Sequence, residues 1–115
     1  MEIGVDIESI SRIKMVLERT PRFKERCFTE KEIIYCDSKG NNCAESYAAR
    51  FSAKEAFSKA IGQPLNWQDV EILNDENGKP EVITYNKAKE LLDNREVKIS
   101  LSHANDMVIA FITIL

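Results

Sequence analysis

The sequence predicts an α+β domain in which a mostly antiparallel sheet packs against one long helix and several shorter ones. Three observations lead to this fold class. Residues 43–62 are rich in strong helix formers, contain no proline and end at a glycine that proline follows two positions later. Residues 97–102 and 107–114 alternate in polarity around a tight turn, which is typical of an antiparallel hairpin. Residues 3–7 contain several β-branched side chains and supply another strand.

The length and composition limit the possibilities. The chain has 115 residues, of which 43% are hydrophobic and 30% charged, so residues 1–115 are expected to form a single globular domain. No segment has the length of a membrane span or the pattern of a signal peptide, and we expect a cytoplasmic protein. The cysteines are three in number and lack CxxC spacing, which predicts neither disulfides nor a zinc site. A domain of this size could extend its core by self-association.

The N-terminal segment is expected to form a strand followed by a helix. In a strand over residues 3–7, the β-branched residues share one face, whereas Gly4 and Asp6 share the other. Apolar residues then recur at helical spacing over residues 8–18, and the pair Thr20-Pro21 ends this helix. Considered alone, Asp6 is most simply explained as a cap for that helix.

The long helix follows a shorter one and a loop. A capping box that begins at Thr29 predicts a helix over residues 30–36, and residues 38–42 form a polar loop. Within the long helix, residues three and four apart share a face. One face carries Phe51, Glu55, Ser58, Lys59 and Gly62, and an apolar face carries Ala53, Phe57, Ala60 and Ile61. Considered alone, the spacing of Glu55 and Lys59 indicates a surface ion pair worth roughly a few tenths of a kcal/mol.

The remaining elements are short. Residues 70–73 and 81–83 are expected to form strands joined by a turn at residues 77–80, and residues 85–93 a helix. The final hairpin turns at residues 104–106 and places His103, the only histidine, near its tip.

Charge is unevenly distributed along the chain. Residues 12–31 carry seven bases and three acids, a net charge of +4, so with a total of -3 the remainder carries -7. This basic segment is either a solvated helix face or a docking site for nucleic acid, a membrane surface or an acidic protein. The acidic balance of the whole chain argues against the first two of these partners. Phe23 lies within the segment and is either a core residue, the simpler reading, or an exposed anchor.

Three segments taken together resemble the signature blocks of the holo-[acyl-carrier-protein] synthases, the short bacterial branch of the 4'-phosphopantetheinyl transferases. They are GVDIESISRI at residues 4–13, RFSAKEAFSKAIG at residues 50–62 and LSH at residues 101–103. The blocks occur in the family's order, and the NGKP turn at residues 77–80 also fits. Two departures are the single glycine before Val5 and the presence of Val16 where a longer side chain is usual.

The resemblance implies the fold of these transferases and their reaction. The 4'-phosphopantetheine arm of coenzyme A is moved to a serine of an apo acyl carrier protein, with release of adenosine 3',5'-bisphosphate, in fatty acid biosynthesis. Attack on a diphosphate requires neutralised oxygens, and Mg²⁺ with one or two carboxylate ligands provides this. By resemblance, Asp6 and Glu55 are the metal ligands. Glu55, or a water that it orients, is our hypothesis for the general base, and Lys59 and His103 act near the phosphates.

The resemblance also implies two sets of contacts and an assembly. The residues expected to contact coenzyme A are Arg50, Lys54, Ser58, Lys59, Gly62 and His103. The residues expected to dock the acidic carrier protein are Arg12, Arg19, Arg22, Phe23 and Arg26. Short members of the family are homotrimers with active sites between subunits, and this chain is expected to follow them.

Two alternatives remain open from the sequence. A different metal-dependent phosphoryl or nucleotidyl transferase could use the same two carboxylates but would release a different product. A non-catalytic module that binds acidic helices through residues 12–26 would need neither Asp6 nor Glu55.

Overall fold

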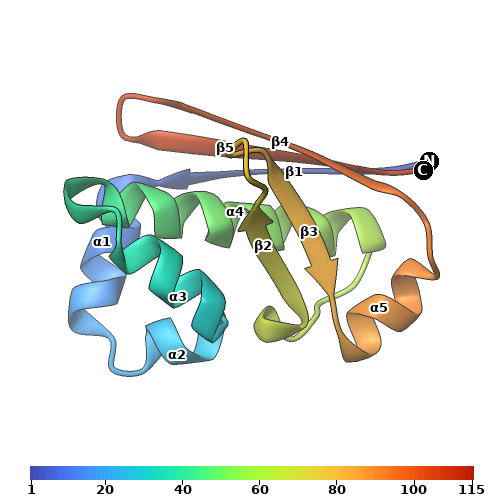
Figure 1. Ribbon diagram of the computed structural model, residues 1–115, viewed down its shortest axis with the longest axis horizontal. Helices are drawn as coiled ribbons and strands as arrows, with labels where there is room; N and C mark the ends of the chain where they lie inside the picture. The colour runs from blue at the N-terminus through green and yellow to red at the C-terminus, as the bar shows by residue number, and fades with distance from the viewer.

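The protein is described by a computed structural model that covers residues 1–115 (Figure 1). The elements in chain order are β1 (Glu2–Ser9), α1 (Ile10–Arg19), α2 (Phe23–Cys27), α3 (Glu30–Asp37), α4 (Cys43–Ile61), β2 (Val70–Asn74), β3 (Pro80–Thr84), α5 (Asn86–Leu92), β4 (Val97–Ala104) and β5 (Met107–Ile114). Two short 3-10 helices, η1 (Gly40–Asn42) and η2 (Trp67–Asp69), precede α4 and β2. The predicted α+β class with one long helix is confirmed.

The strands form two antiparallel sheets. The larger one has the strand order β1-β5-β4 and the smaller one pairs β2 with β3. Figure 1 shows α4 running along the larger sheet, with α1, α2 and α3 gathered near the beginning of α4. The chain termini lie together at the opposite end. None of the helices combines the length and the apolar composition that a membrane span requires.

Most predicted boundaries agree with the structure to within a few residues. The capping box at Thr29 starts α3, and Gly62 ends α4 in a left-handed conformation with φ of 92°. The first helix begins at Ile10 rather than at the predicted residue 8. Strand β1 continues to Ser9, whose side chain accepts a hydrogen bond from the amide of Arg12 and caps α1. Helix α2, Phe23–Cys27, is an element that the sequence pattern did not predict.

The main core lies between α4 and the larger sheet. The apolar face predicted for α4 is buried there through Ala53, Phe57 and Ala60, and Ile61 packs at its edge. Strand β5 contributes alternate residues to the same cluster: Ala110, Ile112 and Ile114. A second cluster joins α1, α2 and α3 to the first half of α4. The long helix therefore links both parts of the interior.

Helix α4 packs closely on β1 because Gly4 has no side chain. A Cβ atom at Gly4 would lie 2.8 Å from the amide nitrogen of Ala60 and would overlap the carbonyl oxygen of Ala56. The face of β1 that carries Gly4 and Asp6 therefore meets α4. The opposite face of the strand is exposed and carries Ile3, Val5 and Ile7.

Replacing Gly4 by alanine is expected to lower the free energy of unfolding by about 1–3 kcal/mol or more, because the methyl group meets helix backbone that cannot move aside. Urea unfolding followed by circular dichroism measures this. Ser102→Ala on the exposed face of β4 serves as a control and should stay close to the parent protein. An unchanged midpoint for Gly4→Ala would contradict the close contact between α4 and β1.

Candidate active site

Asp6 lies in the middle of β1 and points toward α4. Its side chain is 11% exposed, and the hydroxyl of Ser52 donates a hydrogen bond of 3.0 Å to its Oδ2 atom. The ammonium group of Lys59 lies 3.4 Å from its Oδ1 atom and also donates to the carbonyl oxygen of Val5 at 3.1 Å. Two residues of α4, seven positions apart, therefore hold Asp6 from either side.

Glu55 lies between those two contacts on the same face of α4. It follows Ser52 by three positions and precedes Lys59 by four, so it faces β1 as they do. Burial raises the pKa of Glu55, the charge of Asp6 raises it further, and Lys59 partly opposes this change. The structure thus brings together the two carboxylates that lie 49 residues apart in the sequence, a separation counted from their residue numbers.

Glu8 is a third acid at this place, and the sequence analysis missed it. Because β1 extends to Ser9, Glu8 shares the inward face of the strand with Gly4 and Asp6. Its side chain is 12% exposed. Its pKa is raised by burial first and then by Asp6, with a smaller contribution from Glu55. The continued alternation after Asp6 was the available signal, but residues 8–18 were all assigned to the following helix.

The residues fit a hard divalent cation. Asp6, Glu8 and Glu55 bring more negative charge than Lys59 neutralises, and carboxylate oxygens are the ligands that Mg²⁺ prefers. No three or more His, Cys, Asp and Glu side chains of the chain are placed so that together they could hold a metal ion. Mg²⁺ does not need such a group, because it usually takes one or two carboxylates and completes its coordination with water and substrate phosphates.

The shifted acids predict a dependence of stability on pH in the absence of divalent cations. A carboxyl whose pKa is higher in the folded than in the unfolded protein makes stability fall as pH rises from 4.5, the usual pKa of a glutamate, through the raised value. Glu8→Gln should therefore stabilise the protein at about pH 7 and have little effect at about pH 3, where Glu8 is protonated in both states. Thermal unfolding in EDTA measures this. A variant less stable than the parent at neutral pH would show that the contact of Glu8 with Arg12 dominates instead.

A cavity of about 520 Å³ opens beside the acids. Its α4 wall includes Glu55 and four of the predicted coenzyme A contacts, Lys54, Ser58, Lys59 and Gly62. Its other wall is the loop that leads from α4 to Trp67. The side chain of Lys59 is 57% exposed and lines this cavity, so it is available to a ligand there.

Lys54 is buried and its ammonium is bound within the protein. Its side chain is 1% exposed, and its ammonium donates to Glu32 Oε1 at 2.7 Å and to the carbonyl oxygens of Trp67 and Val70. An ammonium has three protons, and all three are used within the protein. Lys54 lines the cavity, but its ammonium protons are committed to the protein, so its contact with coenzyme A stays a prediction. Lys54 is next to Glu55 in the sequence, but adjacent residues of a helix point about 100° apart, so the two side chains face different neighbours.

Arg50 and His103 lie at a second place, away from the acids. His103 Nδ1 is 2.8 Å from Glu45 Oε1, and ten residues separate Glu45 from Glu55, a rise of about 15 Å along α4. A cavity of about 410 Å³ is lined here by His103, Asn74 and other residues. Arg50 precedes Glu55 by five residues and points to nearly the opposite side of the helix. Within a single chain, His103 and Arg50 therefore lie away from Asp6 and Glu55.

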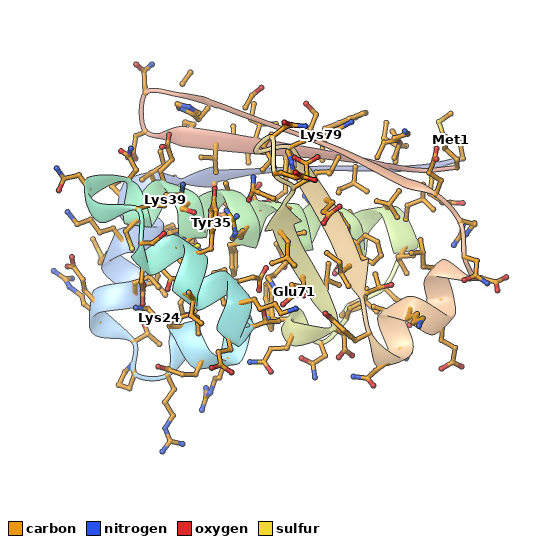
Figure 2. All side chains as sticks on the ribbon, viewed as in Figure 1. Met1, Lys24, Tyr35, Lys39, Glu71 and Lys79 are labelled. Atoms are coloured by element: carbon orange, nitrogen blue, oxygen red, sulfur yellow. The ribbon has the colours of Figure 1, made fainter.

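The surroundings of Arg50 suit an anion. Its guanidinium is buried, lies 4.2 Å from the centre of the Tyr35 ring and donates to Ser46 and Asn74. Its Nε atom is buried and has no hydrogen-bond partner in the protein. The ammonium of Lys39 lies 4.5 Å from the same ring, and Figure 2 shows Tyr35 and Lys39 next to each other. Two cationic groups thus lie close to the Tyr35 ring, and this ring and Lys39 line the second cavity.

The basic segment forms the exposed surface of α1 and α2. The four predicted docking bases are exposed: Arg12, Arg19, Arg22 and Arg26. Phe23 is only half-buried, and its ring packs against Phe28 and Phe51 at centroid distances of 6.0 and 5.8 Å. The prediction that Phe23 is a core residue is therefore correct in part. Only the exposed part of its side chain is available to a partner.

Comparison with known proteins shows to which class of proteins this fold and these paired acids belong. Residues 2–112 match the sequence profile of the 4'-phosphopantetheinyl transferase superfamily, and the chain belongs to this family. It is 44% identical to the holo-[acyl-carrier-protein] synthase of Chloroherpeton thalassium, over 99% of this chain and 97% of that protein. It is also 44% identical to that of Caldanaerobacter subterraneus, over 90% of this chain and 86% of that protein.

A solved structure agrees with the fold. The holo-[acyl-carrier-protein] synthase of Bacillus anthracis, crystallised in complex with coenzyme A (3',5'-ADP), superposes with a TM-score of 0.83 at 35% identity. The similarity covers 98% of this chain and 94% of that one.

Proposed function

We propose that this protein transfers the 4'-phosphopantetheine group of coenzyme A to a serine of an apo acyl carrier protein and releases adenosine 3',5'-bisphosphate, in fatty acid biosynthesis. The observation that carries the proposal is the convergence of Asp6 and Glu55, with Lys59, beside a cavity in a chain of this family. The names of the relatives support the same reaction.

Each residue of the site has a place in the reaction. Asp6 and Glu55 are proposed to hold Mg²⁺, which when bound would neutralise diphosphate oxygens and stabilise the leaving phosphate. Lys59 has one ammonium proton left after its contacts with Val5 and Asp6, and it directs that proton to a phosphate oxygen in the cavity.

Proton transfer requires a base near the acceptor serine. Glu55 is proposed to take the serine proton, directly or through an ordered water, as the serine oxygen bonds to phosphorus and the bond to the bisphosphate leaving group breaks. Glu55 lines the cavity beside Asp6, which places its carboxylate where the serine of a bound carrier protein would approach.

The two separated sites favour an assembly in which each active site is shared. We propose a homotrimer in which Arg50 and His103 of one subunit complete the acid site of its neighbour and bind the phosphates at the adenosine end of coenzyme A. The exposed outer face of β1 and β5 supports this, because it is apolar over Ile3, Val5, Ile7, Met107, Ile109 and Phe111. An apolar patch spread over two strands is typical of a subunit interface.

Charged substitutions on this face are expected to dissociate the assembly and to abolish turnover, although they leave every proposed site residue in place. Val5→Lys combined with Ile109→Glu tests this, since both side chains are exposed in the single chain. Light scattering gives the mass and a transfer assay gives the activity. Glu90→Lys on the exposed surface of α5, away from this sheet face, is the control. A monomeric variant that keeps full activity would contradict the shared site.

The transfer itself can be tested directly. The protein is incubated with coenzyme A, Mg²⁺ and an apo acyl carrier protein, the carrier is weighed by mass spectrometry, and adenosine 3',5'-bisphosphate is measured by chromatography. A mass gain of one phosphopantetheine with equal release of the bisphosphate is expected. Release of another nucleotide product, or an unmodified carrier, would reject the proposed function.

A further inference from the structure

The turn between β4 and β5 is bound to the beginning of α1, far away in the sequence. Asp106 accepts hydrogen bonds at one carboxylate oxygen from the hydroxyls of Ser9 and Ser11, at 2.7 and 2.6 Å. Its other oxygen accepts from the amide of Ser11 at 3.0 Å, and its carbonyl oxygen accepts from the amide of Ile10 at 2.7 Å. Three successive residues at the junction of β1 and α1 thus converge on Asp106.

Besides Asp106, helix α1 is held by its Ser9 cap and by the packing of Ile13 in the second cluster. It contains ten residues, its only fully buried side chain is that of Ile13, and it has no acid in its first turn. A helix N-terminus is stabilised by a carboxylate that accepts from its free amides. Asp106 supplies this carboxylate from a turn that lies 95 positions after Ser11. Asn105 has φ of 55°, so the turn follows a left-handed path at the residue before Asp106.

The direction of α1 decides where the proposed docking bases lie relative to the acids. Asp6 is on β1, and the chain passes from β1 into α1 at Ser9 without a loop. A helix of ten residues is about 15 Å long, so a rotation of about 10° at its first turn moves its far end by roughly 2.6 Å. Arg19 is at that end. A carrier protein bound there must still present its serine beside Asp6.

We infer that Asp106 is a positioning residue for carrier recognition, which fixes the angle between α1 and β1 and so the distance from the docking bases to the acid site. This rests on the proposed function. Asp106 is exposed and the hydrogen bonds involve the junction alone, so its loss should alter the angle of α1 rather than unfold the protein. The side chain touches neither the cavity beside Glu55 nor the second cavity at His103.

Steady-state kinetics with coenzyme A and apo carrier protein separate this role from a general structural one. Asp106→Ala is expected to raise the KM for the carrier about tenfold, because the docking bases lose their orientation relative to the acids. The KM for coenzyme A should stay within about twofold of the parent value. Asp106→Asn keeps an acceptor for the Ser11 amide. Its KM for the carrier should therefore lie between those of the parent protein and of Asp106→Ala. Glu76→Ala removes an exposed acid from the other hairpin and controls for net charge.

A double-mutant cycle with Ser11→Ala connects the effect to the observed contacts. If Asp106 acts through Ser11, the change in carrier KM for the double variant is smaller than the product of the single changes. A carrier KM unchanged in Asp106→Ala, or KM values for both substrates that rise together with a lowered melting temperature, would overturn the inference while leaving the proposed function intact. An inactive parent protein would instead refute the proposed function.

Discussion

Replacing Glu55 by glutamine is expected to lower transfer turnover by at least about a thousandfold, even at saturating Mg²⁺. The substitution keeps the shape of the side chain but removes both the charge that a divalent cation needs and the group proposed to accept the serine proton. Asp6→Asn removes only a charge that the divalent cation needs. A higher Mg²⁺ concentration should therefore restore part of its turnover. The initial rate of carrier modification at several Mg²⁺ concentrations measures both effects.

The loss should not come from unfolding. The pKa of Glu55 is raised by burial and by Asp6, so its ionised form is unfavourable in the folded protein, and glutamine relieves this repulsion. The melting temperature of Glu55→Gln in EDTA is therefore expected to equal or exceed that of the parent. Glu90→Gln, an exposed residue of α5, is the matched control and should retain activity. Near-parental turnover by Glu55→Gln would reject both roles assigned to Glu55.

Replacing Lys54 by methionine is expected to lower the free energy of unfolding by about 3–5 kcal/mol. Methionine is similar in length, so the loss is mainly electrostatic. The carboxylate of Glu32 would remain buried without its counter-charge, while the carbonyl oxygens of Trp67 and Val70 would lose a donor. Glu32 also accepts from the amide of Ile72, so the pair joins α3, α4 and the free edge of β2.

Chemical denaturation measures this loss, with the dependence of the unfolding free energy on denaturant concentration fitted separately for each variant. Lys98→Met is the matched control, because Lys98 and its partner Glu96 are both 61% exposed and such pairs contribute roughly 0–1 kcal/mol. Adding Glu32→Gln to Lys54→Met should recover part of the stability, since no buried charge is then left unpaired. A loss for Lys54→Met as small as that of Lys98→Met would contradict the structural role given to Lys54.

The sequence by itself determined those features that depend on neighbouring residues. The capping box at Thr29, the glycine stop at Gly62 and the alternation of residues 107–114 each specify local backbone geometry, and all three appear in the structure. The motif resemblance selected Asp6 and Glu55, and helical periodicity placed Glu55 and Lys59 on one face. These signals act over a few residues and can be read without knowledge of the fold.

Only the tertiary structure decided what each face meets. Gly4 allows α4 to approach β1, so the strand turns its acids inward and its β-branched residues outward. Glu8 joins the acids because the strand continues to Ser9, and Lys54 is occupied by Glu32 from another helix. The separation of Arg50 and His103 from the acids likewise follows from packing. A side chain's partner depends on which distant segments come together, and local periodicity carries no information about that.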